Sequence, residues 1–154
     1  MKKLIIYFSW SNNTKTLAEE IAKELNIDIV RLERKVPYSR DYNECAYVEA
    51  KEEVDRSIHP EIKELNVNFE SYDKILLFFP IWWYTFPMPV ASLIEKMKGY
   101  KGEVQVFANS YTNSEQYMIN SMRDLKNLDE SINFTRGLFN QSTKKHIEFI
   151  GGDK

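Results

Sequence analysis

The stretch YFSWSNNTKT, residues 7–16, joins an apolar run to an amphipathic one. The apolar run from Leu4 to Phe8 contains β-branched and aromatic residues, which is typical of a buried parallel strand. Apolar residues then recur at helical spacing from Leu17 to Leu25, so we expect a helix after a turn of about six residues. Nearly every side chain in that turn carries a hydroxyl or an amide. Together with the unpaired N–H groups of a helix N-terminus, these side chains favour a phosphate ligand.

The same residue types are also favoured as helix N-caps without any ligand, so both interpretations stay open at this point. No glycine precedes Gly99, and the motifs G-x-x-x-x-G-K-(S/T) and G-x-G-x-x-G are therefore absent from this part of the chain. The turn instead resembles the phosphate loop of flavodoxins, (S/T)-x-(S/T)-G-N-T. The matching positions are Ser9, Ser11, Asn13 and Thr14. Asn12 replaces the glycine of the family, and asparagine is the non-glycine residue that best tolerates a left-handed backbone.

Length and composition limit the possible classes of protein. The chain has 154 residues, 43% of them hydrophobic, which suits a single domain, residues 1–154, with a sizeable core. The formal net charge of −2 and the lack of a basic block argue against nucleic acid as a partner. Only about five apolar residues follow the N-terminal lysines, too few for a signal peptide or a membrane span, so we expect a cytoplasmic protein with no membrane partner. Cys45 is alone, and His59 and His146 are far apart, so we expect neither a disulfide nor a metal site.

Strands and helices alternate along the rest of the chain. Further strands are expected at residues 27–32, 74–79, 104–108 and 132–139, and helical spacing follows each of them. The unbroken apolar run ILLFF at 75–79 predicts that the strand 74–79 is central, whereas Asp28 and Arg31 predict an edge position for the strand 27–32. This alternation predicts an α/β fold, a flavodoxin-like doubly wound five-stranded parallel sheet of order 2-1-3-4-5 with helices on both faces.

The crossover between the second and third strands is longer than a minimal connection requires. Helical spacing from Asn43 predicts a helix with one apolar face. The residues of that face are Tyr47, Ala50, Val54 and Ile58. Pro60 then marks the start of a short helix that would bury Ile62 and Leu65.

Three unusual loops follow the first, third and fourth strands, at residues 9–14, 80–89 and 109–113. In a sheet of this order, ligands bind beyond the carboxyl ends of those strands. The loop 80–89 is uncharged and contains Trp82, Trp83 and Tyr84, which would expose an apolar patch unless they fold into the core, form a dimer surface or are covered by a flat molecule. Flavin mononucleotide (FMN), a planar ring joined to a phosphate, satisfies both the first and the second loop.

The segment PIWWYTFPMPV, residues 80–90, resembles the P-I-W-W-G-T-x-P-x-P-V loop of a short-chain flavodoxin-like family. With the phosphate loop, the resemblance covers most of the chain and implies FMN as the cofactor. The residues that it assigns to the FMN site are Ser9, Trp10, Ser11, Asn12, Asn13 and Thr14 at the phosphate, Pro80, Ile81, Trp82, Trp83 and Tyr84 beside the isoalloxazine, and Asn109, Ser110 and Tyr111 at the pyrimidine edge. Tyr84 departs from the family glycine, whose peptide turns over near flavin N5 on reduction; a side chain there would restrict that motion.

The resemblance implies an FMN flavoprotein that carries electrons between redox partner proteins. The first alternative is an NAD(P)H-dependent FMN reductase acting on quinones or other small acceptors, and the fold alone does not separate the two. A phosphoacceptor signalling domain needs carboxylates where this chain has Ser9 and Pro80, and a cofactor-free interaction module is the last alternative. No catalytic side chain is assigned, and the oligomeric state is left open. The loops 80–89 and 108–113 carry no charged residue, so we expect a reduced-state potential less negative than in strongly acidic flavodoxins.

Overall fold

The computed structural model describes residues 1–153 and contains one five-stranded parallel sheet. The strands are β1 (Lys3–Tyr7), β2 (Asp28–Arg31), β3 (Lys74–Pro80), β4 (Glu103–Asn109) and β5 (Asn133–Phe139). Their order is β2-β1-β3-β4-β5, which confirms the predicted topology and the edge position of β2. The order reverses between β1 and β3, and this is the point at which sheets of this type bind ligands.

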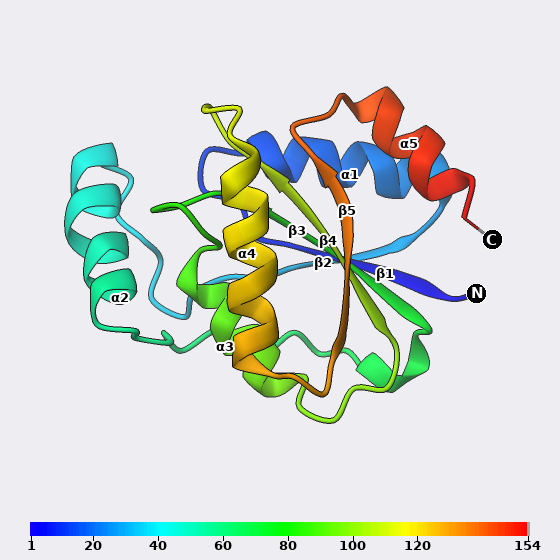
Figure 1. Ribbon diagram of the computed structural model, residues 1–154, viewed down its shortest axis with the longest axis horizontal. Coiled ribbons are helices and arrows are strands. Elements are labelled where there is room, and N and C mark those ends of the chain that lie inside the picture. The colour runs from blue at the N-terminus through cyan, green and yellow to red at the C-terminus, as the bar shows by residue number, and fades with distance from the viewer. Residues whose placement is uncertain (154) are drawn as a thin grey trace.

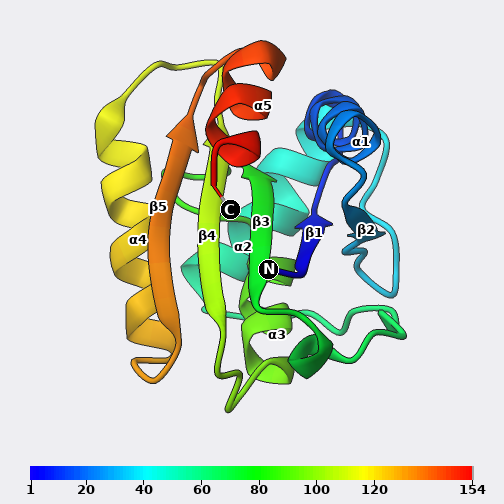
Figure 2. The ribbon, with the colours of Figure 1, turned by 90° about the vertical axis from the view of Figure 1, so that its right-hand side faces the viewer.

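Helices cover both faces of the sheet, with α1 and α5 on one face and α3 and α4 on the other (Figure 2). The helices are α1 (Asn13–Leu25), α2 (Lys51–Asp55), α3 (Met88–Lys96), α4 (Glu115–Leu128) and α5 (Thr143–Gly151). Within residues 1–153, no helix combines the length and the apolar composition needed to cross a membrane.

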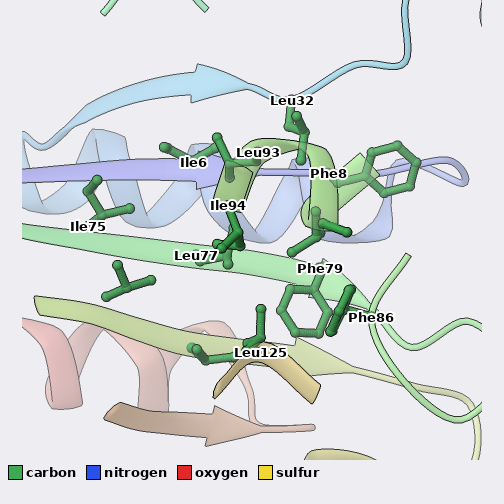
Figure 3. Close-up of a cluster of buried hydrophobic side chains, with 14 of the residues drawn as sticks. Ile6, Phe8, Leu32, Ile75, Leu77, Phe79, Phe86, Leu93, Ile94 and Leu125 are labelled. Atoms are coloured by element: carbon green, nitrogen blue, oxygen red, sulfur yellow. The ribbon is translucent and has the colours of Figure 1, made fainter. Parts of the chain in front are cut away.

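Two apolar clusters, one on each face of the sheet, explain the unbroken apolar runs of β1 and β3. Successive strand residues point to opposite faces, so Ile5 and Leu76 join the cluster below α1 and α5. Their neighbours Ile6 and Leu77 join the cluster below α3, which also contains Leu93 (Figure 3). All five side chains are fully buried. A strand covered on both faces cannot show alternation, which is why these runs indicated central parallel strands.

The crossover between β2 and β3 differs from the sequence prediction. The expected helix begins with a π-helical segment, Glu44–Ala50, which continues into α2. Its buried side chains include Cys45 and Glu53, whereas Tyr47, predicted to face inward, is 57% exposed. A π-helix closes i→i+5 hydrogen bonds, so a periodicity of 3.6 residues assigns its faces incorrectly. The short helix predicted from Pro60 is also wrong: Ile62 forms an isolated antiparallel bridge with Arg34, and the next helical turn is the 3-10 segment Phe69–Ser71.

A buried polar cluster fixes the position of this crossover helix, the name we use for residues 44–55. Arg34 donates to Glu53 at 2.9 Å and to Glu49 at 3.1 Å, and its guanidinium lies 3.7 Å from the ring centre of Tyr38. The Tyr38 hydroxyl donates to the second oxygen of Glu53. Burial raises the pKa of Glu53, and the hydrogen bonds from Tyr38 and Arg34 oppose that rise. The cluster therefore ties the crossover helix to the chain leaving β2. Figure 1 shows α2 apart from the sheet, at the end opposite the N-terminus.

Candidate functional site

A cavity of about 660 Å³ lies at the carboxyl ends of β1, β3 and β4, which is where the strand order reverses. This volume falls within the range of roughly 300–1,000 Å³ that is usual for small-molecule sites. The predicted site residues that line it are Trp10, Ser11, Asn13, Pro80, Ile81, Trp82, Trp83, Tyr84, Asn109, Ser110 and Tyr111. The three loops selected from the sequence therefore converge on one space.

The crossover helix and α4 supply a wall that the sequence analysis did not anticipate. The additional lining residues are Tyr42, Cys45, Ala46, Tyr47, Ala50, Thr112 and Tyr117. Periodicity assigned Tyr47 to a core-facing surface, but the π-helical start turns it toward the cavity. The concentration of tyrosine between residues 38 and 47 was an available signal, because exposed aromatic side chains on a surface segment indicate a binding function.

The turn before α1 has the features of an anion cradle. Asn12 adopts φ 72° and ψ 0°, the left-handed conformation expected of the residue that replaces glycine. Among residues 1–153, no side chain caps α1, whereas the Ser142 hydroxyl caps α5 by accepting from the backbone N–H of Lys145. The Ser9 hydroxyl is buried and has no hydrogen-bond partner among residues 1–153. A buried polar group without a partner is costly, so this loop fits a bound phosphate better than a simple N-cap.

Three of the predicted phosphate residues lie outside the wall of the main cavity. Asn12 is exposed at the start of α1, and Ser9 faces a smaller hollow of about 120 Å³ that also contains Arg31 and Arg40. Thr14 is buried, and its hydroxyl donates to Asn109 Oδ1 at 2.8 Å. This hydrogen bond joins the first loop to the third. Direct contact of these three residues with a phosphate stays a prediction.

The second loop contains a strained two-residue turn at Trp83 and Tyr84. Both residues have positive φ, 50° and 71°, and Trp82 and Thr85 exchange backbone hydrogen bonds of 2.9 and 3.3 Å across the turn. Positive φ at both central positions defines a type I′ turn, which normally takes asparagine, aspartate or glycine. Tyr84 thus keeps the left-handed backbone that the family glycine would adopt without strain.

Contacts from α4 hold this turn in place. The Asn120 side-chain amide donates to the carbonyl oxygen of Tyr84 at 3.1 Å. One residue further on, the Thr85 hydroxyl donates to Asp124 Oδ2 at 2.8 Å. Asn120 is itself oriented by Gln116, whose amide donates to Asn120 Oδ1 at 2.9 Å. The turn therefore has a defined position relative to α4.

A chain of aromatic contacts runs along the rim of the cavity. The ring pairs, with centroid separations, are Trp10–Tyr42 at 6.1 Å, Tyr42–Tyr47 at 6.3 Å, Tyr47–Trp83 at 5.4 Å, Trp83–Tyr84 at 6.5 Å and Tyr84–Tyr117 at 5.8 Å. The Trp83 indole N–H also donates to the carbonyl oxygen of Ala46 at 2.8 Å, which links the second loop to the crossover helix. Such rings offer faces and edges to a flat ligand.

The cavity wall carries no aspartate, glutamate, lysine, arginine or histidine among the described residues. Burial raises the pKa of Cys45 to about 11, which disfavours its thiolate form at neutral pH. The wall therefore offers aromatic, hydroxyl, amide and thiol groups but, among the described residues, no acidic or basic side chain. Its chemistry is suited to enclosing an uncharged aromatic ring beside a phosphate cradle.

Comparison with known proteins agrees with this geometry. The sequence model of a family described as flavodoxin matches residues 2–149, while comparison with curated proteins gave no match. A putative flavoprotein from Bacteroides eggerthii is 25% identical with a TM-score of 0.83, over 98% of this chain and 96% of that one. A flavoprotein from Lactobacillus acidophilus, solved in complex with FMN, is 24% identical with a TM-score of 0.80, over 97% and 98%. An NADPH-quinone reductase from P. pentosaceus is 14% identical with a TM-score of 0.52, over 99% and 95%. The match over residues 2–149 shows that the chain belongs to the flavodoxin family.

Proposed function

We propose that this protein binds FMN in the cavity and carries electrons between redox partner proteins. The observation that carries the proposal is an uncharged aromatic cavity that opens beside an uncapped helix N-terminus. FMN is the cofactor that family membership assigns, and the Lactobacillus flavoprotein of the same fold was solved with it. The cytoplasmic location and the transfer of electrons to partner proteins stay predictions.

The chain's own residues have distinct roles in this proposal. The Ser9 and Ser11 hydroxyls and the free N–H groups of α1 hold the phosphate, and the positive end of the α1 dipole favours its charge. Trp82 and Trp83 enclose the ring from the second loop, and Tyr111 approaches from the third. When bound, FMN supplies the electron-transfer chemistry. The protein orients it and excludes water from it.

The uncharged wall also bears on the potential of the site. No carboxylate in the wall opposes an anionic reduced flavin, so desolvation is the main unfavourable contribution. We therefore expect a reduced-state potential less negative than in strongly acidic flavodoxins. A redox titration that finds a strongly depressed second potential would contradict this.

The second candidate function is an NAD(P)H-dependent reductase of quinones or other small acceptors. It is favoured by two rings at the rim, Tyr84 and Tyr111, which are 61% and 98% exposed and available to stack a second flat molecule. Continuous oxidation of NADH or NADPH by the isolated FMN-loaded protein, with a quinone as acceptor, would establish the reductase. No oxidation above the rate with free FMN would favour the carrier.

The experiment that tests the proposal is a fluorescence titration of cofactor-free protein with FMN and, in parallel, with riboflavin. Tight quenching of FMN and weak quenching of riboflavin would support both the phosphate cradle and the aromatic cavity. The Ser9→Ala variant should weaken FMN binding about tenfold or more, since hydrogen bonds to charged groups contribute about 1.5–3 kcal/mol, and should leave riboflavin unchanged. Ser71→Ala, which changes an exposed serine in the 3-10 segment before β3, is the control. Absence of quenching with both ligands would refute FMN binding.

A further inference from the structure

We propose that the turn Trp82–Thr85 is a fixed wall of the FMN site whose central peptides do not turn over on reduction, and that Asn120 is the positioning residue that holds the Tyr84 carbonyl away from the cavity. This inference rests on the proposed FMN site. It goes beyond that site because Asn120, on α4, lies outside the cavity wall. Asn120 nevertheless contacts the backbone of the turn, which forms part of the wall.

The backbone itself opposes turnover of the first central peptide, between Trp83 and Tyr84. Turnover rotates ψ of the preceding residue and φ of the following residue by about 180°. Trp83 would then keep its positive φ of 50° with a reversed ψ, which is the first central position of a type II′ turn. That position is dominated by glycine because a Cβ is strained there.

The second central peptide, between Tyr84 and Thr85, is opposed in the same way. Tyr84 has φ 71°, and the second central residue of a type I′ turn has ψ near 0°, so turnover would bring ψ of Tyr84 close to 180°. That region is essentially restricted to glycine. Neither central peptide can therefore reverse without placing an aromatic L-residue in a conformation reserved for glycine.

Hydrogen bonds from α4 add a second restraint to the same peptide. The Tyr84 carbonyl oxygen accepts from Asn120 at 3.1 Å, so it points toward α4. The Gln116 amide fixes the orientation of Asn120, and the Asp124 carboxylate holds the hydroxyl of Thr85 at 2.8 Å. Turnover of the Tyr84–Thr85 peptide would break the hydrogen bond with Asn120 and leave a polar group to find another partner.

The consequence concerns the proton that a flavin gains at N5 on reduction. Reduction to the anionic form adds two electrons and one proton to FMN; the proton is gained at N5, and the new N–H requires an acceptor. By resemblance to the family, the turn lies beside N5. Since the Tyr84 carbonyl is held by Asn120 and its peptide does not turn over, that carbonyl is not presented to the new N–H, and the first electron gains no stabilisation from it.

The test compares four variants in the FMN-loaded protein: Tyr84→Gly, Tyr84→Ala, Asn120→Ala and the double variant Tyr84→Gly/Asn120→Ala. Dye-equilibrated reduction with dithionite gives the two one-electron midpoint potentials of each. In the double variant, the first potential should rise relative to the second by at least about 59 mV, which corresponds to a tenfold change in a one-electron equilibrium constant. Tyr84→Gly alone should give a smaller change. Tyr84→Ala and Asn120→Ala should leave the separation unchanged, because an L-residue still blocks turnover.

Each contrary result overturns a stated part of the proposal. An unchanged separation in the double variant would refute the link between the turn and the flavin. A full shift in Tyr84→Ala would refute the backbone argument, and equal shifts in Tyr84→Gly and the double variant would remove the role of Asn120. In the cofactor-free protein, NMR relaxation dispersion at residues 82–85 should show exchange in the double variant and none in the wild type. That measurement tests the fixed turn even if FMN does not bind, so its failure is distinct from failure of the proposed function.

Discussion

Replacing Tyr84 with glycine should make the protein more stable than replacing it with alanine. Tyr84 has φ 71°, and a left-handed backbone costs an L-residue roughly 1–2 kcal/mol. Glycine relieves this strain but loses roughly 0.5–1 kcal/mol through its greater freedom in the unfolded chain. Both variants lose the same partly exposed ring and its contact with Tyr117, so that loss cancels between them. The expected difference is about 1 kcal/mol in favour of glycine, or about 2–4 °C in melting temperature for a chain of this length.

Urea unfolding of cofactor-free protein, followed by circular dichroism, measures this difference. The control is the same pair of substitutions at Tyr47, an exposed tyrosine in a helical segment. Glycine there should be less stable than alanine by about 1 kcal/mol, because a helical position penalises glycine. The reasoning is refuted if alanine at position 84 is as stable as glycine, or if both positions show the same sign.

Three further predictions concern contacts elsewhere in the molecule. Thr14→Val should cost about 1 kcal/mol of unfolding free energy in urea titrations and weaken FMN binding, because it removes the hydrogen bond to Asn109 that joins two loops. Trp83→Phe keeps an aromatic ring but loses the indole donor to the crossover helix, so amide exchange in that helix should accelerate. Burial lowers the pKa of His146, so the unfolded state binds the proton more readily and stability should fall as pH drops below about 6.5. Melting curves across pH should lose this slope in His146→Gln and keep it in the exposed control His59→Gln.

The sheet, and the point at which its strand order reverses, could be predicted because both follow from the pattern of apolar and polar residues along the chain. The run ILLFF at residues 75–79 has no polar position, and only a strand covered on both faces tolerates that. The charged residues Asp28 and Arg31 placed β2 at an edge for the same reason. The left-handed conformation of Asn12 could also be inferred locally, since its motif position requires one and asparagine tolerates it.

The crossover helix could not be predicted, because interactions distant in sequence determine its shape. Arg34, from the chain after β2, binds Glu49 and Glu53 on the helix. Contacts between segments this far apart cannot be read from the local spacing of apolar residues. The resulting π-helical start presents Tyr47 to the cavity instead of the core. Much of one cavity wall was therefore missing from the predicted site, even though the loops at the strand ends were identified.

The strain at Trp83 and Tyr84 is itself an argument about function. The other non-glycine residues with positive φ among residues 1–153 are four asparagines and Ser57, small polar residues for which the left-handed region is accessible. The Asn120 hydrogen bond and the bridge between Trp82 and Thr85 help to hold the two large aromatic residues in that region. Glycine at these positions would relieve the strain but remove two rings from the cavity rim. Since the rings contribute little to the core, the strain supports the proposal that they enclose a ligand.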